Sequence, residues 1–224
     1  MTSTPLHANP ARPTTPAQAW QVLREGNARF ISDSRAHPHQ DVHKREELAA
    51  KQAPFAIFFG CADSRVAAEI IFDQGLGDLF VVRTAGHVVD PSVLGSLEFG
   101  VVSLGAPLIV ILGHDSCGAV TATLDAARTG LMPPGFLRDI VERVMPSVLT
   151  ARAGREEVAP DEVEREHVMH TARLLADRSR AIGDRVADGR LAIVGAQYDL
   201  ADGEARLVGS LGDIGLPASA ATIP

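Results

Sequence analysis

Residues 54–60 read PFAIFFG and residues 107–113 read PLIVILG, and these two stretches decide the fold class. Both are short, almost wholly apolar and end in glycine. Neither shows the alternation of polar and apolar residues that marks a strand with one face in water. Strands of this kind are covered on both faces, which is typical of a mostly parallel sheet between layers of helices. The sequence therefore predicts an α/β fold.

The segments around these two runs complete the predicted sheet and its layers. Strand-like composition recurs at 78–84, 190–199 and 204–210, and the turn pair Asp202-Gly203 joins the last two as an antiparallel edge hairpin. Thr15 followed by Pro16 predicts the start of an N-terminal helical arm. Further helical patterns occupy 45–51, 64–73, 91–105, 117–129, 136–152 and 161–188.

Length, charge and composition limit the domain organisation and the partners. The 224 residues carry 21 Lys and Arg against 28 Asp and Glu, a net charge of −7, and 46 % are hydrophobic. We expect one domain at 15–214 between tails at 1–14 and 215–224. The acidic balance argues against nucleic acid as a partner. The sequence has neither a long apolar stretch nor a secretory signal pattern, which predicts no membrane span and a cytoplasmic protein.

The two cysteines of the chain follow the two apolar runs. Cys61 comes directly after the first run, and His114 and Cys117 come after the second. The carboxyl ends of parallel strands meet at one edge of a sheet, so these loops are expected to converge. Two thiolates and one imidazole favour zinc, one ion per chain, and leave its fourth position open for water or substrate. We expect a helix N-terminus after each cysteine to lower the thiol pKa.

Asp63 and Arg65 lie on the same loop as Cys61 and can form a charge-assisted pair beside the metal. An ionised Asp63 would accept a hydrogen bond from water or hydroxide on the metal and orient it. The alternative is structural, with Asp63 or Ser64 as the N-cap of a helix that starts at Arg65. Ser116 is likewise explained structurally as the N-cap of the next predicted helix, at 117–129.

CADSR at 61–65 together with HDSCGAV at 114–120 resembles the β class of carbonic anhydrases, here of a bacterial type, whose signatures are C-x-D-x-R and H-x-x-C-G. The resemblance extends over FVVRTAGH at 80–87, the LGSLEFGV helix and the VGAQYD strand. It covers the chain from about residue 15 to residue 210.

This resemblance implies zinc on Cys61, His114 and Cys117, with either water or Asp63 as the fourth ligand. When Asp63 leaves the metal it pairs with Arg65, and water takes its place. The implied reaction is the reversible hydration of CO2 to bicarbonate and a proton through zinc-bound hydroxide. Because Asp63 and hydroxide compete for one position, falling pH is expected to favour the closed, inactive form.

Two further residues are assigned to the substrate by the same resemblance. Gln52 matches a glutamine that donates a hydrogen bond toward substrate, although an exposed helix end also explains it, and Gly118 is the glycine of H-x-x-C-G. A non-catalytic bicarbonate pocket needs tryptophan, arginine and tyrosine, and here Phe58 stands with Arg83 and Tyr198, without the indole N–H. Family members form homodimers or homotetramers whose N-terminal helices embrace a neighbour.

Rival functions remain open at this point. A phosphatase loop needs an arginine six residues after its cysteine, where this chain has Ala67 and Thr123. A cysteine hydrolase with His114 as base leaves the second cysteine without a role. A closed site with Asp63 as fourth ligand would make a non-catalytic zinc or redox-sensing protein, and hydrolysis of COS or CS2 would use the same fold.

The remaining histidines and charges are expected to be structural or exposed. His87 is expected to pack near the end of the sheet, and His167 and His170 to lie on a helix surface or a subunit contact. The mixed charges of 152–166 are expected to face solvent.

Overall fold

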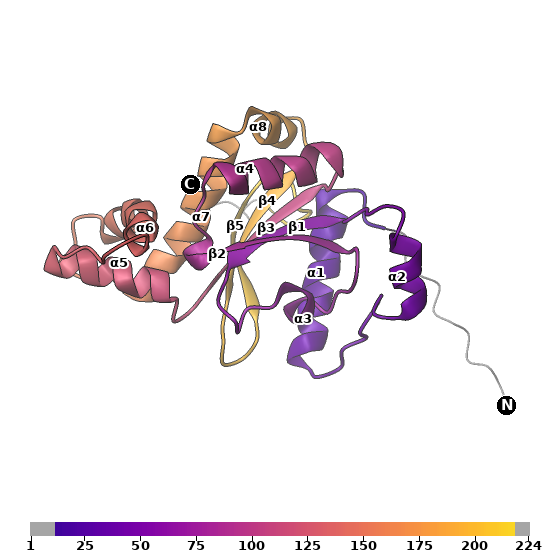
Figure 1. Ribbon diagram of the computed structural model, residues 1–224, viewed down its shortest axis with the longest axis horizontal. Coiled ribbons are helices and arrows are strands. Elements are labelled where there is room, and N and C mark those ends of the chain that lie inside the picture. The colour runs from indigo at the N-terminus through magenta and orange to yellow at the C-terminus, as the bar shows by residue number, and fades with distance from the viewer. Residues whose placement is uncertain (1–11, 218–224) are drawn as a thin grey trace.

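The computed structural model describes residues 12–217 and has a five-stranded sheet at its centre (Figure 1). The strand order is β2-β1-β3-β4-β5. All neighbouring pairs are parallel except β4 and β5, which form an antiparallel hairpin at one edge. The predicted fold class is thereby confirmed. The strands are β1 (Ala56–Cys61), β2 (Leu79–Thr84), β3 (Leu108–His114), β4 (Ala192–Tyr198) and β5 (Ala205–Leu211).

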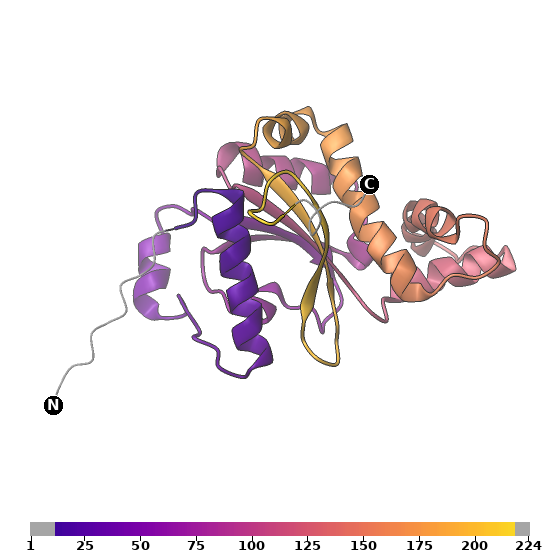
Figure 2. The same cartoon turned by 180° about the vertical axis from the view of Figure 1, so that it is seen from behind.

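Helices cover both faces of this sheet, and the view from behind shows α1 lying across one of them (Figure 2). The helices are α1 (Pro16–Ile31), α2 (Val42–Leu48), α3 (Ala68–Ile71), α4 (Pro91–Glu98), α5 (Gly118–Thr129), α6 (Leu137–Arg152), α7 (Pro160–Arg178) and α8 (Arg180–Ala187). Two short turns complete the list, a 3-10 turn η1 (Ala85–His87) and a π-helical turn η2 (Phe99–Ser103).

Alternation along each buried strand divides the core into two layers. Side chains such as Phe58 and Val110 pack under α1 and α3, where Trp20 is the largest contributor from α1. Their neighbours Phe59 and Ile111 point to the opposite face and pack under α4, α7 and α8. Both faces of β1 and β3 are therefore buried, which is why their sequences show no polar alternation.

The N-terminal arm begins where its sequence predicts. Thr15 is the N-cap of α1, its side chain accepts a hydrogen bond from the Gln18 N–H, and Pro16 occupies the first turn. Further along the helix, buried Asn27 bonds to the Ile71 and Gly203 carbonyls and to the Ala205 N–H. These bonds hold the helix to α3 and to the β4–β5 turn.

Several predicted helix boundaries are wrong. The helix expected at 45–51 begins at Val42, because the Asp41 side chain accepts the Lys44 N–H and caps it. The helix expected at 161–188 breaks at Ser179, whose extended backbone and side-chain bond to the Ile182 N–H start α8. The pattern at 64–73 gives only α3, and that at 91–105 continues from α4 into η2.

The predicted tails fall largely outside the described residues, since 1–11 and 218–224 are not described. Residues 12–14 and 215–217 are described, and Thr14 bonds through its backbone N–H to the Gln18 side chain. Within 12–217 no helix has the length and apolar character needed to cross a bilayer.

Candidate metal centre

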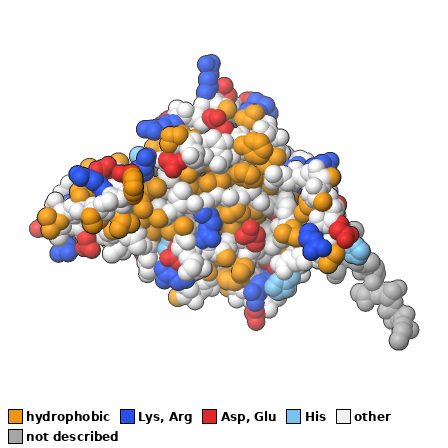
Figure 3. Space-filling view, viewed as in Figure 1, with side chains coloured by type: hydrophobic (Ala, Val, Ile, Leu, Met, Phe, Trp, Pro, Cys, Tyr) orange, Lys and Arg blue, Asp and Glu red, His pale blue; other side chains and the backbone are white. Residues whose placement is uncertain are grey.

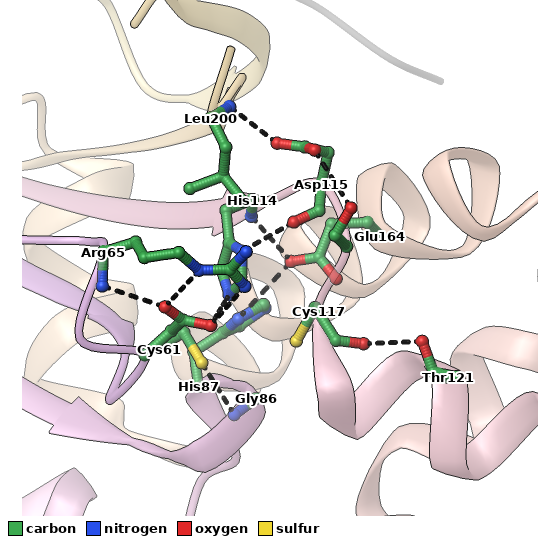
Figure 4. Close-up of polar contacts among 12 residues, drawn as sticks. Cys61, Arg65, Gly86, His87, His114, Asp115, Cys117, Thr121, Glu164 and Leu200 are labelled. Atoms are coloured by element: carbon green, nitrogen blue, oxygen red, sulfur yellow. Dashed lines mark hydrogen bonds and ion pairs between the residues drawn. The ribbon is translucent and has the colours of Figure 1, made fainter.

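The two loops predicted to converge do so at the carboxyl ends of β1 and β3. These strands are parallel neighbours, so Cys61 at the end of β1 lies beside the loop that carries His114 and Cys117. The two sulfurs and one imidazole nitrogen lie within 4.8 Å of one another, and all three residues are buried. This is the spacing of ligands around a single cation (Figure 4).

The donor atoms fit zinc. His114 Nδ1 lies 2.7 Å from the Asp115 carbonyl oxygen, which only accepts, so Nδ1 carries the proton and the Nε2 lone pair is free. Nε2 is buried and has no hydrogen-bond partner among residues 12–217. A buried imidazole lone pair facing two thiols matches a Cys2His zinc site with one open position.

The charge on the two sulfurs is set by their neighbours. The adjacent Cys117 thiol and the Gly86 N–H, which lies 3.3 Å from Cys61 Sγ, lower the pKa of Cys61. The Cys61 sulfur and burial raise the pKa of Cys117. The expectation of a helix N-terminus after each cysteine is wrong for Cys61, because α3 begins only at Ala68, and correct for Cys117, which precedes α5.

Asp63 and Arg65 form the predicted pair at the mouth of this centre. Asp63 Oδ1 accepts from Arg65 Nε at 2.9 Å, and Oδ2 accepts from Nη2 at 2.7 Å. The Arg65 guanidinium thereby holds the pKa of Asp63 well below its usual range. Asp63 Oδ2 also lies 3.9 Å from His114 Nε2, the nitrogen that would bind the metal.

The capping alternatives for these loops are wrong. Asp63 accepts the Arg65 N–H in a local turn, and no side chain caps α3, so neither Asp63 nor Ser64 is its N-cap. Ser116 instead donates to the Asp115 carboxylate, and the N-cap of α5 is Cys117. The Asp63 carboxylate is thus bound by Arg65 and does not cap a helix.

Arg83 is a supporting residue whose role the sequence did not reveal. Its Nε donates to the Cys61 carbonyl at 2.9 Å and its Nη2 to the Asp63 carbonyl at 2.6 Å. It reaches them because Gly60 is its partner in the β1–β2 register. Arg83 therefore fixes the backbone on which both Cys61 and Asp63 stand.

Comparison with known proteins agrees with this geometry. The family profile described as carbonic anhydrase matches residues 56–205. The chain belongs to the carbonic anhydrase family. Carbonic anhydrase 2 of Mycobacterium tuberculosis is 58 % identical over 203 residues, which cover 90 % of this chain and 97 % of that protein. The carbonic anhydrase of Mycolicibacterium smegmatis is 57 % identical over 90 % of this chain and 98 % of its own.

Solved structures place this carbonic anhydrase in the β class. The β-carbonic anhydrase CcaA is 26 % identical with a TM-score of 0.64, covering 83 % of this chain and 93 % of that one. Tetrameric β-carbonic anhydrases of Sordaria macrospora share the fold at 24 % identity and a TM-score of 0.64, over 85 % and 96 % of the two chains. The reaction is CO2 hydration, and Cys61, His114 and Cys117 form the zinc site.

Buried polar residues lie directly behind the zinc site of this carbonic anhydrase. Glu164, expected to face solvent, is buried, and its Oε1 accepts the His114 backbone N–H at 3.1 Å. Burial raises the pKa of Glu164 to about 8. A side chain at Gly113 would meet Glu164 Oε1 at 2.3 Å, so the glycine makes room for the carboxyl group. The charged surroundings of Glu164 in the sequence gave no sign of this.

The histidines divide differently from the prediction. His87 is fully buried, which confirms that it packs inside the structure. His167 is buried too, and the expectation of a surface position for it is wrong, whereas His170 is half-buried. His167 lies under the metal centre because α7 passes behind β3, with its ring 4.4 Å from that of His87 between centroids.

A cavity of about 390 Å³ opens onto the metal centre. Gly118 lines it beside Cys61 and Asp63, and the rest of its wall is mostly apolar, including Ile140 and Val141 of α6. Gln52 does not line this cavity. It is exposed in the segment before β1.

Proposed function

We propose that Asp63 and Arg65 gate and orient the fourth position of the zinc site during CO2 hydration. The observation that carries this role is the position of Asp63 Oδ2, 3.9 Å from His114 Nε2 and held by Arg65 at 2.7 Å. One carboxylate therefore lies within a small movement of two partners, the metal position and the guanidinium.

Zinc held by Cys61, His114 and Cys117 would supply a hydroxide nucleophile near neutral pH by lowering the pKa of bound water from 15.7 to about 7. Asp63, paired with Arg65, would accept a hydrogen bond from a nucleophile held beside His114 and so orient it toward CO2. Arg65 keeps the carboxylate ionised and away from the metal. The apolar cavity beside Gly118 is suited to CO2, which has no charge.

The pH response follows from the charge of Asp63. Because the pKa of Asp63 is lowered, the carboxylate stays ionised as pH falls through the neutral range and protonates only far below it. It therefore remains able to occupy the fourth position while hydroxide becomes scarce. We propose that acidification favours this closed arrangement.

Asp63→Ala tests the proposal. We expect the variant to keep one zinc per chain, to lose roughly 10²-fold in the rate of CO2 hydration, and to change its pH profile between 6.5 and 9. Stopped-flow hydration and zinc analysis measure these quantities. The matched control is Ser64→Ala, since Ser64 is the exposed neighbour on the same turn.

Two results would count against these roles. Unchanged kinetics in Asp63→Ala would remove Asp63 from the reaction. A parent chain with full zinc that shows no hydration at any pH from 6.5 to 9 would support a permanently closed, non-catalytic site instead.

We also propose a homodimer or homotetramer in which Gln52 serves the site of a neighbouring copy. Gln52 precedes β1, whereas Cys61 ends it, and the strand between them spans about 16 Å. Gln52 therefore lies near the opposite end of β1 from Cys61, too far away to reach the zinc site of its own chain. A partner could bind at the sheet edge formed by β2 and at the exposed side chains of Phe99, Val102 and Phe136. Figure 3 shows hydrophobic side chains on this face of the molecule.

Complementation tests the shared site. Neither Cys61→Ser nor Gln52→Ala alone should hydrate CO2 at the parent rate, but hybrids formed from the two should regain part of it. A hybrid pairs an intact zinc site with an intact Gln52 from the other chain. Full activity in a chain that sediments as a monomer would contradict the proposal.

We further propose that the protein is cytoplasmic, because the two thiols that the site needs remain reduced in the cytoplasm.

A further inference from the structure

A chain of hydrogen bonds runs from α6 to the Cys61 sulfur through a histidine that does not touch the metal centre. Ser147 Oγ lies 2.9 Å from His167 Nδ1, and His167 Nε2 lies 2.9 Å from the Gly86 carbonyl oxygen. The N–H of Gly86, which belongs to the preceding peptide group, donates to Cys61 Sγ at 3.3 Å, so the two bonds are linked through the Gly86 Cα. Ser147 and His167 are both buried.

The direction of each bond in this chain is fixed by chemistry. A carbonyl oxygen only accepts, so His167 Nε2 must carry a proton. Burial lowers the pKa of His167 to about 4, so the ring is neutral at neutral pH and has no second proton. Nδ1 therefore accepts from the Ser147 hydroxyl. The Gly86 carbonyl thus fixes the Nε2–H tautomer, and the Ser147 hydroxyl holds the orientation of the ring.

The backbone at Gly86 requires glycine and also a contact that holds its conformation. Its φ of +62° is in the left-handed region, and a Cβ there would meet the Ala119 Cβ at 2.5 Å. Glycine is thus required for the close approach of η1 to α5, but glycine alone does not hold a peptide in one orientation. The hydrogen bond from His167 to the Gly86 carbonyl holds this part of the backbone, and the ring of His87 packs against that of His167.

We propose that His167 is a positioning residue of the zinc site, which directs the Gly86 N–H at the Cys61 thiolate and so sets zinc affinity and the charge on that sulfur. The proposal rests on zinc binding by Cys61, His114 and Cys117. It does not depend on the gating role of Asp63. Hydrogen-bond partners behind a metal ligand typically contribute 10–100-fold to metal affinity.

Two substitutions of His167 distinguish the roles of its two ring nitrogens. The amide nitrogen of His167→Gln reaches the place of Nε2 and can still donate to Gly86. The shorter amide of His167→Asn reaches the place of Nδ1, contacts Ser147 and leaves Gly86 without this donor. Both variants keep a neutral polar side chain. His170→Asn is the control, since it lies one turn further along α7 and makes no hydrogen bond to η1 among the described residues.

The readouts do not depend on catalysis. Zinc affinity is measured by competition with a chelator, and the charge on the sulfur by the thiolate-to-cobalt charge-transfer absorption after replacement of zinc by Co²⁺. We expect His167→Asn to weaken zinc binding by up to about tenfold, the lower end of the range for direct partners of a ligand because His167 acts through Gly86, and to shift the absorption. His167→Gln and His170→Asn should remain within about twofold of the parent. Thermal unfolding of each variant confirms that it is folded.

Three results would overturn the proposal. His167→Asn could match the parent in both affinity and absorption, or His167→Gln could be impaired as much as His167→Asn, which would make ring volume the cause. Should His167→Asn fail to fold, Ser147→Ala keeps the imidazole but removes the hydroxyl that holds the ring in its orientation toward Gly86. An unchanged zinc affinity and absorption in Ser147→Ala would be the third contrary result. Asp63→Ala leaves this chain of bonds intact, so the failure of either proposal is seen separately.

Discussion

Two clusters of buried polar side chains in this carbonic anhydrase differ in whether their hydrogen bonds are complete. Under α1, Asn27 uses both amide hydrogens and its oxygen, and Asp73 accepts from Arg29, the Ala36 N–H and the His37 N–H. At the carboxyl ends of β1 and β3, His114 Nε2 is buried without a partner within residues 12–217.

Together with the two sulfurs that lie close to His114, the difference distinguishes a structural cluster from a binding site. A buried polar atom without a partner costs free energy, so folded proteins rarely keep one unless something else satisfies it. The Asn27 and Asp73 group is complete within the chain and serves to hold α1. The zinc centre becomes complete only when a cation joins the two sulfurs and the imidazole. Substitutions in the two clusters should therefore have different consequences.

The largest expected effect comes from removing a zinc ligand. His114→Ala should lose the metal and, with it, CO2 hydration down to the uncatalysed rate, because two thiols alone cannot retain the ion against competition. Zinc analysis after dialysis and stopped-flow hydration measure both losses. His43→Ala on the exposed face of α2 is the control and should change neither. A His114→Ala chain that keeps zinc and activity would end the assignment of the triad.

The parts of this architecture that the sequence predicted share one property, which is that a local pattern determines them. The apolar runs at 54–60 and 107–113 have no polar face that could lie in water. Their burial on both faces, and with it the sheet, was therefore predictable from their composition. The ligands follow directly after those runs, and the direction of parallel strands brings them together. Helix starts with a cap at the expected place, such as Thr15, were also predictable.

The parts that were missed depend on distant neighbours. Arg83 reaches the Cys61 loop only through the β1–β2 register, and Glu164 is buried only because Gly113 leaves it space. His167 was expected on a surface because α7 has a charged sequence and a weak apolar stripe. Its burial results from α6 packing over α7. None of these relations leaves a local pattern in the sequence.

The smallest expected effect comes from a substitution in the structural cluster under α1. Asn27→Ala leaves the Ile71 and Gly203 carbonyls and the Ala205 N–H without their side-chain partner, which should lower the free energy of unfolding by about 1–3 kcal/mol. Denaturant unfolding measures this loss, with exposed Arg24→Ala on the same helix as a control that should change it by less than about 0.5 kcal/mol. Because the cluster is complete without a ligand, zinc content and hydration per bound zinc should remain those of the parent. Lost zinc in a folded Asn27→Ala chain would mean that the two clusters are coupled and that the arm contributes to the metal centre.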